Sequence, residues 1–221
     1  MTPARQIRAS FDDSTITVYQ AYSASIADPA VASQKLTASP HFKKGRMTWI
    51  KPSWAWMLYR SGYSYKDPGQ ERILALKMRH DDFVGLLRRG VLSSHAGMRQ
   101  MSSSTTAREH TTDVRIQWDP ERTVRLEKLE HRSIQIGIPA SLSAHWAEDC
   151  IVGIEDVTAK ARELKLFLEN HPDADEQLLI TQGLVPVELP FDVPEDVRQA
   201  LGMDMDMLQM ITKEKPAMDR K

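Results

Sequence analysis

The stretch RMTWIKPSWAWMLYRSGY, residues 46–63, holds three of the chain's five tryptophans, two tyrosines and three Lys or Arg side chains. It predicts a short strand over 47–50 and a helix over 52–61, because Pro52 suits the first turn of a helix and Gly62 its end. A helix this short cannot bury two aromatic faces, so we expect it between the core and a cleft. Aromatic planes among cations are typical of sites for stacked anionic ligands such as nucleotides.

Composition predicts a single globular domain in a reducing compartment. The chain has 221 residues, 41% hydrophobic and 27% charged, with Cys150 as its only cysteine, so internal disulfides and thiolate zinc sites are excluded. The first ten residues lack the apolar run of a signal peptide, and no stretch is apolar enough to span a membrane. We therefore expect a cytoplasmic protein with no membrane partner, and a nuclear location stays open.

Charge is unevenly distributed although the net charge is −1. Residues 41–132 contain 18 Lys and Arg against 10 Asp and Glu, whereas residues 146–221 contain 8 against 17. The basic half is compatible with a surface that faces a polyanion. The acidic half is equally compatible with solvated helix faces and a tail.

The rest of the chain predicts short strands and helices without regular βαβ alternation. We expect strands and a turn over 5–22, and further elements at these positions: helix 24–36, strand 72–78, helix 81–91, loop 93–112, strand 114–118, turn 119–122, strands 124–129 and 133–138, and helix 158–170. This order favours an α+β fold, with a mixed, mainly antiparallel sheet and helices packed on it. Residues 1–172 would form the main domain, 173–211 an extended segment wrapped around it, and 212–221 a disordered tail.

Motifs with known reactions are absent. The ten glycines form neither GxGxxG nor GxxxxGK, which argues against a helicase, a kinase or a Rossmann enzyme. The seven histidines form no HExxH and have no cysteine partner in metal-ligand spacing. We therefore predict no metal site.

Six blocks in order carry a resemblance to a known family: IRASFDDSTITVYQAY, RMTWIKPSWAWMLYRSGY, QERILAL, QWDPER, RSIQIGI and IVGIEDVT. They resemble the domain of unknown function 4291 family over about residues 5–160. Phe11 and Trp54 depart from the family's usual Tyr and Phe, and both keep aromatic bulk. The resemblance implies no established activity, so chemistry has to come from the residues.

Polar and aromatic residues inside those blocks are the candidate site. Guanidinium forks bind phosphate oxygens, aromatic faces stack on bases or nicotinamide, and glutamine holds a ribose hydroxyl or orients a nucleophile. The candidate ligand-binding residues are Tyr19, Tyr22, Arg46, Trp49, Lys51, Trp56, Tyr59, Arg60, Arg122 and Arg132. Large aromatics at these spacings are often core residues, so Trp49 and Trp56 are equally open to a structural role, and for Trp54 the core is favoured.

Three functions stay open at this point. The first is a nucleotide-using transferase loosely similar to ADP-ribosyltransferases, with NAD as cofactor, Arg8 on the dinucleotide, Tyr19 or Tyr22 on nicotinamide, and Gln135 near the ribose. Arg8 and Gln135 are thus the candidate catalytic residues. The second is a non-catalytic module that binds RNA or single strands through the same surface. The third is a protein-interaction domain with a structural aromatic core.

Overall fold

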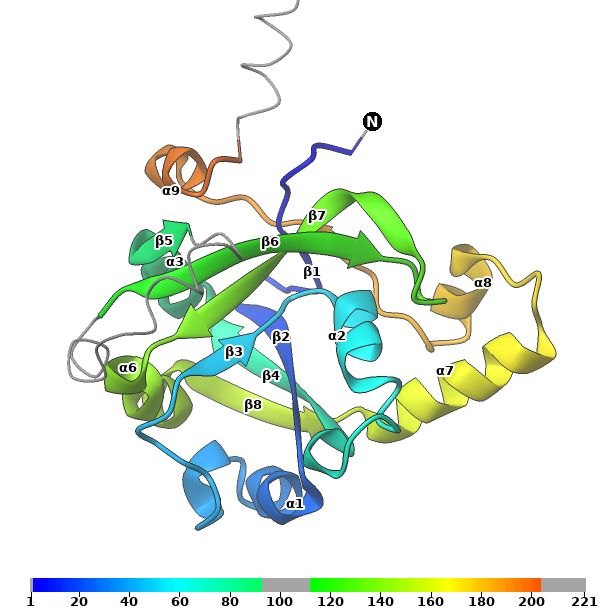
Figure 1. Cartoon of the computed structure of the whole chain (residues 1–221), viewed down its shortest axis with the longest axis horizontal. Helices are drawn as coiled ribbons and strands as arrows, with labels where there is room; N and C mark the ends of the chain where they lie inside the picture. The colour runs from blue at the N-terminus through cyan, green and yellow to red at the C-terminus, as the bar shows by residue number, and fades with distance from the viewer. Residues whose placement is uncertain (1, 93–111, 204–221) are drawn as a thin grey trace, which may run out of the picture.

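The strands form mainly antiparallel sheets in the computed structural model, which describes residues 2–92 and 112–203 (Figure 1). A three-stranded sheet has the order β2-β4-β8, with bounds Thr15–Tyr22, Arg72–Arg79 and Ile151–Asp156. A four-stranded sheet has the order β3-β7-β6-β5, with bounds Thr48–Ile50, Lys128–Ile138, Val114–Arg122 and Gly90–Leu92. The short strands β1 (Arg8–Ala9) and β9 (Leu189–Pro190) pair with each other, and only β5 and β6 run parallel among the described strands.

Helices lie around these sheets, as Figure 1 shows. Their bounds are Ala24–Ser33 (α1), Trp54–Ser61 (α2), His80–Arg88 (α3), Ala140–His145 (α6), Thr158–Asn170 (α7), Glu176–Thr181 (α8) and Glu195–Ala200 (α9). A π-helical turn, η3 (Trp146–Cys150), continues α6, and short 3₁₀ turns occupy Leu36–Ala38 (η1) and Pro68–Gln70 (η2). The α+β class, with mainly antiparallel sheets, is confirmed.

The sheet β2-β4-β8 separates two apolar clusters, because successive side chains of a strand point to opposite faces. Val18 of β2 and Leu76 of β4 face the larger cluster, with Ile116 and Ile136 of the other sheet. Alternate residues such as Tyr19 and Ile73 face the second cluster, which collects side chains of α2, α7 and α8. One sheet therefore holds both halves of the core together.

A backbone bridge joins the two larger sheets, where Tyr19 of β2 pairs with Lys51 just beyond β3. Tyr19 N donates to Lys51 O at 2.6 Å, and Lys51 N donates to Tyr19 O at 3.2 Å. Pro52 and Ser53 follow, and the Ser53 side chain caps α2 by accepting from Trp56 N at 3.0 Å. The residues that join the sheets thus also start the helix.

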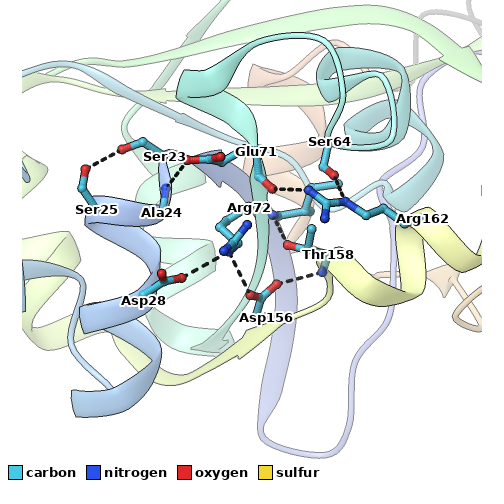
Figure 2. Close-up of polar contacts among 11 residues, drawn as sticks. Ser23, Ala24, Ser25, Asp28, Ser64, Glu71, Arg72, Asp156, Thr158 and Arg162 are labelled. Atoms are coloured by element: carbon cyan, nitrogen blue, oxygen red, sulfur yellow. Dashed lines mark hydrogen bonds and ion pairs between the residues drawn. The ribbon is translucent and has the colours of Figure 1, made fainter.

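Polar side chains tie α1, α7 and the η2 turn to the start of β4 (Figure 2). Arg72 Nε lies 3.2 Å from Asp28 Oδ1 and 3.7 Å from Asp156 Oδ2, so one guanidinium links α1, β4 and β8. Arg162 of α7 donates to Ser64 Oγ at 2.8 Å and to Glu71 O at 3.3 Å. Residues 64–71, which include η2, are held in place by these contacts.

The predicted turn at 119–122 is wrong. β6 continues through Asp119 and Pro120 to Arg122, paired with β7, and its register shifts between Pro120 and Arg122. The chain reverses later, where Leu126 adopts a positive φ of 71°. The shift in register absorbs the proline, which has no N–H to give to the ladder. The strand predicted over 133–138 is part of β7, but of the strand predicted over 124–129 only Lys128 and Leu129 belong to β7, and residues 124–127 form the turn instead.

Other predicted elements need smaller adjustments. The helix over 158–170 matches α7, and Gly62 ends α2 in the left-handed conformation with a φ of 57°. Residues 173–203, expected to be extended, contain the short helices α8 and α9 with β9 between them. Most of the predicted loop at 93–112 and the whole predicted tail at 212–221 lie outside the described residues.

Candidate functional site

A cavity of about 730 Å³ opens where the two larger sheets meet. Its walls come from β2, β3, β6, β7, α2, the η2 turn and the loop before β3, so parts of the chain far apart in sequence form it. The candidate residues that line it are Tyr19, Tyr22, Arg46, Trp49, Lys51, Arg60 and Gln135. We call it the Trp49 cavity, and its volume is that of a typical small-ligand site.

Lys51 forms the buried wall of this cavity. Its side chain is 5% exposed, and its Nζ lies 3.1 Å from the centroid of the Trp56 ring and 3.8 Å from Asp119 Oδ2. Nζ also donates to Gln135 Oε1. Burial is the largest influence and lowers the pKa of Lys51 well below its usual value, while nearby Asp119 opposes this shift.

Glutamine side chains next to Lys51 have fixed orientations. Because the lysine amine is a donor here, Gln135 accepts with Oε1 and donates its amide N–H to Gln117 Oε1 at 2.7 Å. A second chain of hydrogen bonds runs from Tyr22 OH to Gln20 Oε1 at 2.6 Å, and from Gln20 to Thr48 Oγ1. Both chains line the cavity with polar groups whose donors and acceptors are set.

The aromatic wall of the cavity depends on a glycine. Trp49 is half-buried and pairs across the ladder with Gly137 of β7, and its ring covers that glycine. A Cβ on Gly137 would lie 2.8 Å from two carbons of the Trp49 ring. The absent side chain thus sets how deep the ring lies against β7.

Cations surround the cavity on its solvent side. Arg46 and Arg60 are exposed and line it from the loop before β3 and from α2. His41 and Lys43 belong to the same lining. A ligand in the cavity would therefore meet Lys51 on the buried side and guanidinium groups on the other, which suits phosphate oxygens.

Five candidate residues lie outside the Trp49 cavity. Trp56 is 7% exposed, and its ring packs against the Lys51 amine, so the role of Trp56 in this structure is packing. Arg122 stacks on Tyr59 with its Cζ 3.8 Å from the ring centroid, and Arg132 is exposed on β7. Arg8 lines a different cavity, so Arg8 and Gln135 do not share one pocket.

That second cavity, of about 500 Å³, contains Arg8 and Arg122 with the carboxylates of Glu121 and Glu188. Glu188 Oε1 accepts from Trp54 N at 2.6 Å, and Glu121 Oε1 accepts from Ser53 Oγ at 2.9 Å. Arg8 is engaged with backbone, donating to Glu188 O at 2.8 Å. Burial raises the pKa of Glu188 to about 8, and nearby Glu121 adds to the shift. These carboxylates cap the start of α2, which gives them a structural role.

Sequence reasoning missed Glu188 and the rim residues His41, Lys43 and Gln70. Glu188 is one glutamate in a proline-punctuated segment, and nothing local indicates that it reaches Trp54 from 134 residues away. The rim residues sit in polar loops, where a cation or an amide is ordinary. Only the spatial arrangement identifies them.

One protein-family model covers nearly all of the residues that the structure describes. The model of the family described as "Domain of unknown function (DUF4291)" matches residues 6–191. The chain belongs to this family. The match includes the DUF4291 blocks around the Trp49 cavity and extends past them to the segment that carries Glu188. No curated protein matches the chain.

The described residues contain neither a cluster of metal ligands nor a membrane-spanning helix. No group of three or more His, Cys, Asp or Glu within 2–92 and 112–203 is placed to hold a metal ion. None of the helices in these ranges has the length and apolar character that crossing a membrane requires.

Proposed function

We propose that the protein binds a nucleotide, or another phosphate-bearing ligand with a planar ring, in the Trp49 cavity. The observation that carries this proposal is the convergence of Arg46, Arg60 and Lys51 with Trp49 on one cavity. These four side chains come from a loop, a helix and a strand, so their meeting is a product of the fold. Cations on two sides of an aromatic ring suit a ligand with phosphate oxygens at one end and a base at the other.

We further propose a transferase that is loosely similar to ADP-ribosyltransferases and uses NAD. The glycosidic carbon–nitrogen bond would break, nicotinamide would leave, and a nucleophile would add to the ribose carbon. Catalysis would be electrostatic, because the cations stabilise the diphosphate while positive charge develops on the ribose. Gln135, whose side chain is oriented by Lys51, would hold a ribose hydroxyl.

In this proposal, residues other than Arg8 bind the dinucleotide. Arg8 lines the second cavity and donates to Glu188 O, whereas Arg46 and Arg60 line the cavity of Gln135. Arg46 and Arg60 would therefore bind the diphosphate. Tyr22, which also lines the Trp49 cavity, would lie beside the nicotinamide ring together with Trp49.

Titration with NAD and with ATP, followed by tryptophan fluorescence, tests the binding step, and nicotinamide release tests the reaction. Arg60→Ala should weaken binding on the order of ten- to hundredfold, as expected for one charged hydrogen-bond donor. Arg132→Ala is the matched control, because Arg132 is exposed and outside the cavity. Absence of binding at millimolar NAD and ATP, or equal effects of the two variants, would contradict the proposal.

One observation favours a second candidate, a non-catalytic module that binds RNA or single strands. Lys43 and Arg46 line the cavity and are exposed, so two cations of the loop before β3 are open to solvent beside it. Binding of an oligonucleotide should then weaken steeply as salt rises, in proportion to the phosphates contacted. Binding that is independent of salt, or absent, would remove this candidate.

A further inference from the structure

Lys51 is the one lysine in the described residues that combines burial with a place in the lining of the Trp49 cavity. Two backbone hydrogen bonds to Tyr19 fix its main chain, and its amine contacts Gln135, Asp119 and the face of Trp56. A surface lysine samples many rotamers, whereas this amine is held in one position against the cavity. Positive charge alone does not require a buried amine in a fixed position, because Arg46 and Arg60 already supply positive charge to the cavity.

The charged groups around Lys51 come from the two elements packed against it. Asp119 and Glu121 of β6 favour the ammonium form, and Arg60 of α2 disfavours it. Loss of water around the amine is the largest influence and lowers its pKa well below the usual value. Lys51 therefore has a larger share of free amine near neutral pH than an exposed lysine, and the Asp119 carboxylate is close enough to take up a proton.

We propose that Lys51 forms an imine with an aldehyde or ketone of a phosphorylated ligand in the Trp49 cavity. Burial beside a second cation is the setting in which lysine acts as a nucleophile toward carbonyl groups. The proposal deepens the proposed function and rests on it for the phosphate, which Arg46 and Arg60 would bind. It names a covalent step that nucleotide binding alone does not require.

The step balances without a cofactor. The amine lone pair adds to the carbonyl carbon, and the carbonyl oxygen takes the proton that the amine nitrogen loses. The resulting hydroxyl leaves as water after a second proton transfer, and a carbon–nitrogen double bond remains. Asp119 Oδ2 lies 3.8 Å from Nζ, which is beyond direct hydrogen bonding, so this carboxylate would accept and return the protons through one water molecule.

The probe for this step is pyridoxal 5′-phosphate, which unites a planar ring, a phosphate and an aldehyde. The intact protein is incubated with the probe at pH 7, reduced with sodium borohydride and mapped by peptide mass spectrometry. Lys51 should carry several times more label than exposed Lys77, because loss of water around its amine raises its share of free amine and the cavity would bind the phosphate of the probe. Labelling of Lys51 no greater than that of Lys77 would overturn the proposal.

Two variants and a competitor separate this proposal from the proposed function. Lys51→Met should abolish the specific label, whereas Lys77→Gln should keep it, and the wild-type map decides the matter if Lys51→Met does not fold. ATP should protect Lys51 if both proposals hold. If ATP binds and Lys51 takes no label, the imine fails and nucleotide binding stands. Label on Lys51 without ATP binding would support the imine and contradict the nucleotide proposal.

Discussion

Single residues decide the geometry of the Trp49 cavity more than charge content does. Gly137 lies under the Trp49 ring. Gln135, two residues earlier on β7, accepts a hydrogen bond from the Lys51 amine. Neither residue is conspicuous in the sequence, because one has no side chain and the other is an ordinary strand amide. Their roles follow from the register of β3 against β7, which pairs Trp49 with Gly137.

Gly137→Ala should displace the Trp49 ring, because the new methyl group would lie 2.8 Å from two of its carbons. Overpacking of this kind costs on the order of 1–3 kcal/mol in the free energy of unfolding. Denaturant unfolding measures that cost, and tryptophan emission reports the changed environment of the ring. Ligand binding in the cavity should weaken as well.

Gly153→Ala is the control for this prediction, since Gly153 also lies in a strand and the nearest atom to its added Cβ is 3.6 Å away. That is an ordinary contact, so we expect little change. Equal stability and unchanged emission for the two variants would show that Trp49 does not rest on Gly137.

At the scale of elements, helix α2 is the clearest case of a segment completed by distant parts of the chain. Ser53 caps it locally, whereas Glu188 caps Trp54 N from the segment that follows α8. Glu121 of β6 then holds Ser53 itself. The start of α2, which leads into the cavity lining at Met57 and Arg60, is therefore held by three separate parts of the chain.

Glu188 should make stability depend on pH. Its pKa is raised to about 8 in the folded protein from an ordinary value of 4.5, so the folded state holds a proton that the unfolded state has lost between these values. The free energy of unfolding should therefore fall as pH rises from about 4.5 to about 8. The loss would be on the order of 5 kcal/mol at most.

Glu188→Gln should flatten this part of the profile, because the amide imitates the protonated acid and keeps an oxygen for Trp54 N. The melting temperature measured from pH 5 to pH 9 tests this expectation. Glu163→Gln is the control, because Glu163 on α7 is exposed. A variant profile that still falls in parallel with that of the wild type would assign the titration to another group.

At the scale of the whole molecule, the sheet β2-β4-β8 couples the two apolar clusters. Alternate residues of β2 and β4 belong to different clusters, so neither cluster can open without exposing one face of the same sheet. The Tyr19–Lys51 bridge joins this sheet to the four-stranded one beside the cavity. We therefore expect the described domain to unfold as one cooperative unit.

Leu164→Ala and Ile116→Ala test this expectation from the two sides, since both residues are fully buried and belong to different clusters. Each should lower the free energy of unfolding by about 2–5 kcal/mol through the cavity it leaves. Each should shift one common transition, seen alike by far-UV circular dichroism and tryptophan fluorescence. Two separate transitions, with one variant moving each, would show independent halves.

The sequence by itself determined the family, the α+β class and the elements with strong local signals. Helix α7 follows from its apolar periodicity, and the end of α2 follows from Gly62, because both signals act within a few residues. The aromatic and basic stretch at 46–63 also marked one part of the cavity wall, which includes Arg46, Trp49, Lys51 and Arg60. The turn expected at 119–122 failed because pairing with β7 outweighs a local turn signal.

Only the tertiary structure decided which candidates share a site. Arg8 and Gln135 looked like partners in sequence order, yet Arg8 lies beside Glu188, and Gln135 lies beside Lys51. The separation depends on strand register and on the bridge between the sheets. The contacts involved join residues from 18 to 134 positions apart in the chain, and such contacts leave no local pattern. The lowered pKa of Lys51 and the raised pKa of Glu188 likewise arise from loss of water around the two groups, which happens only once the chain has folded.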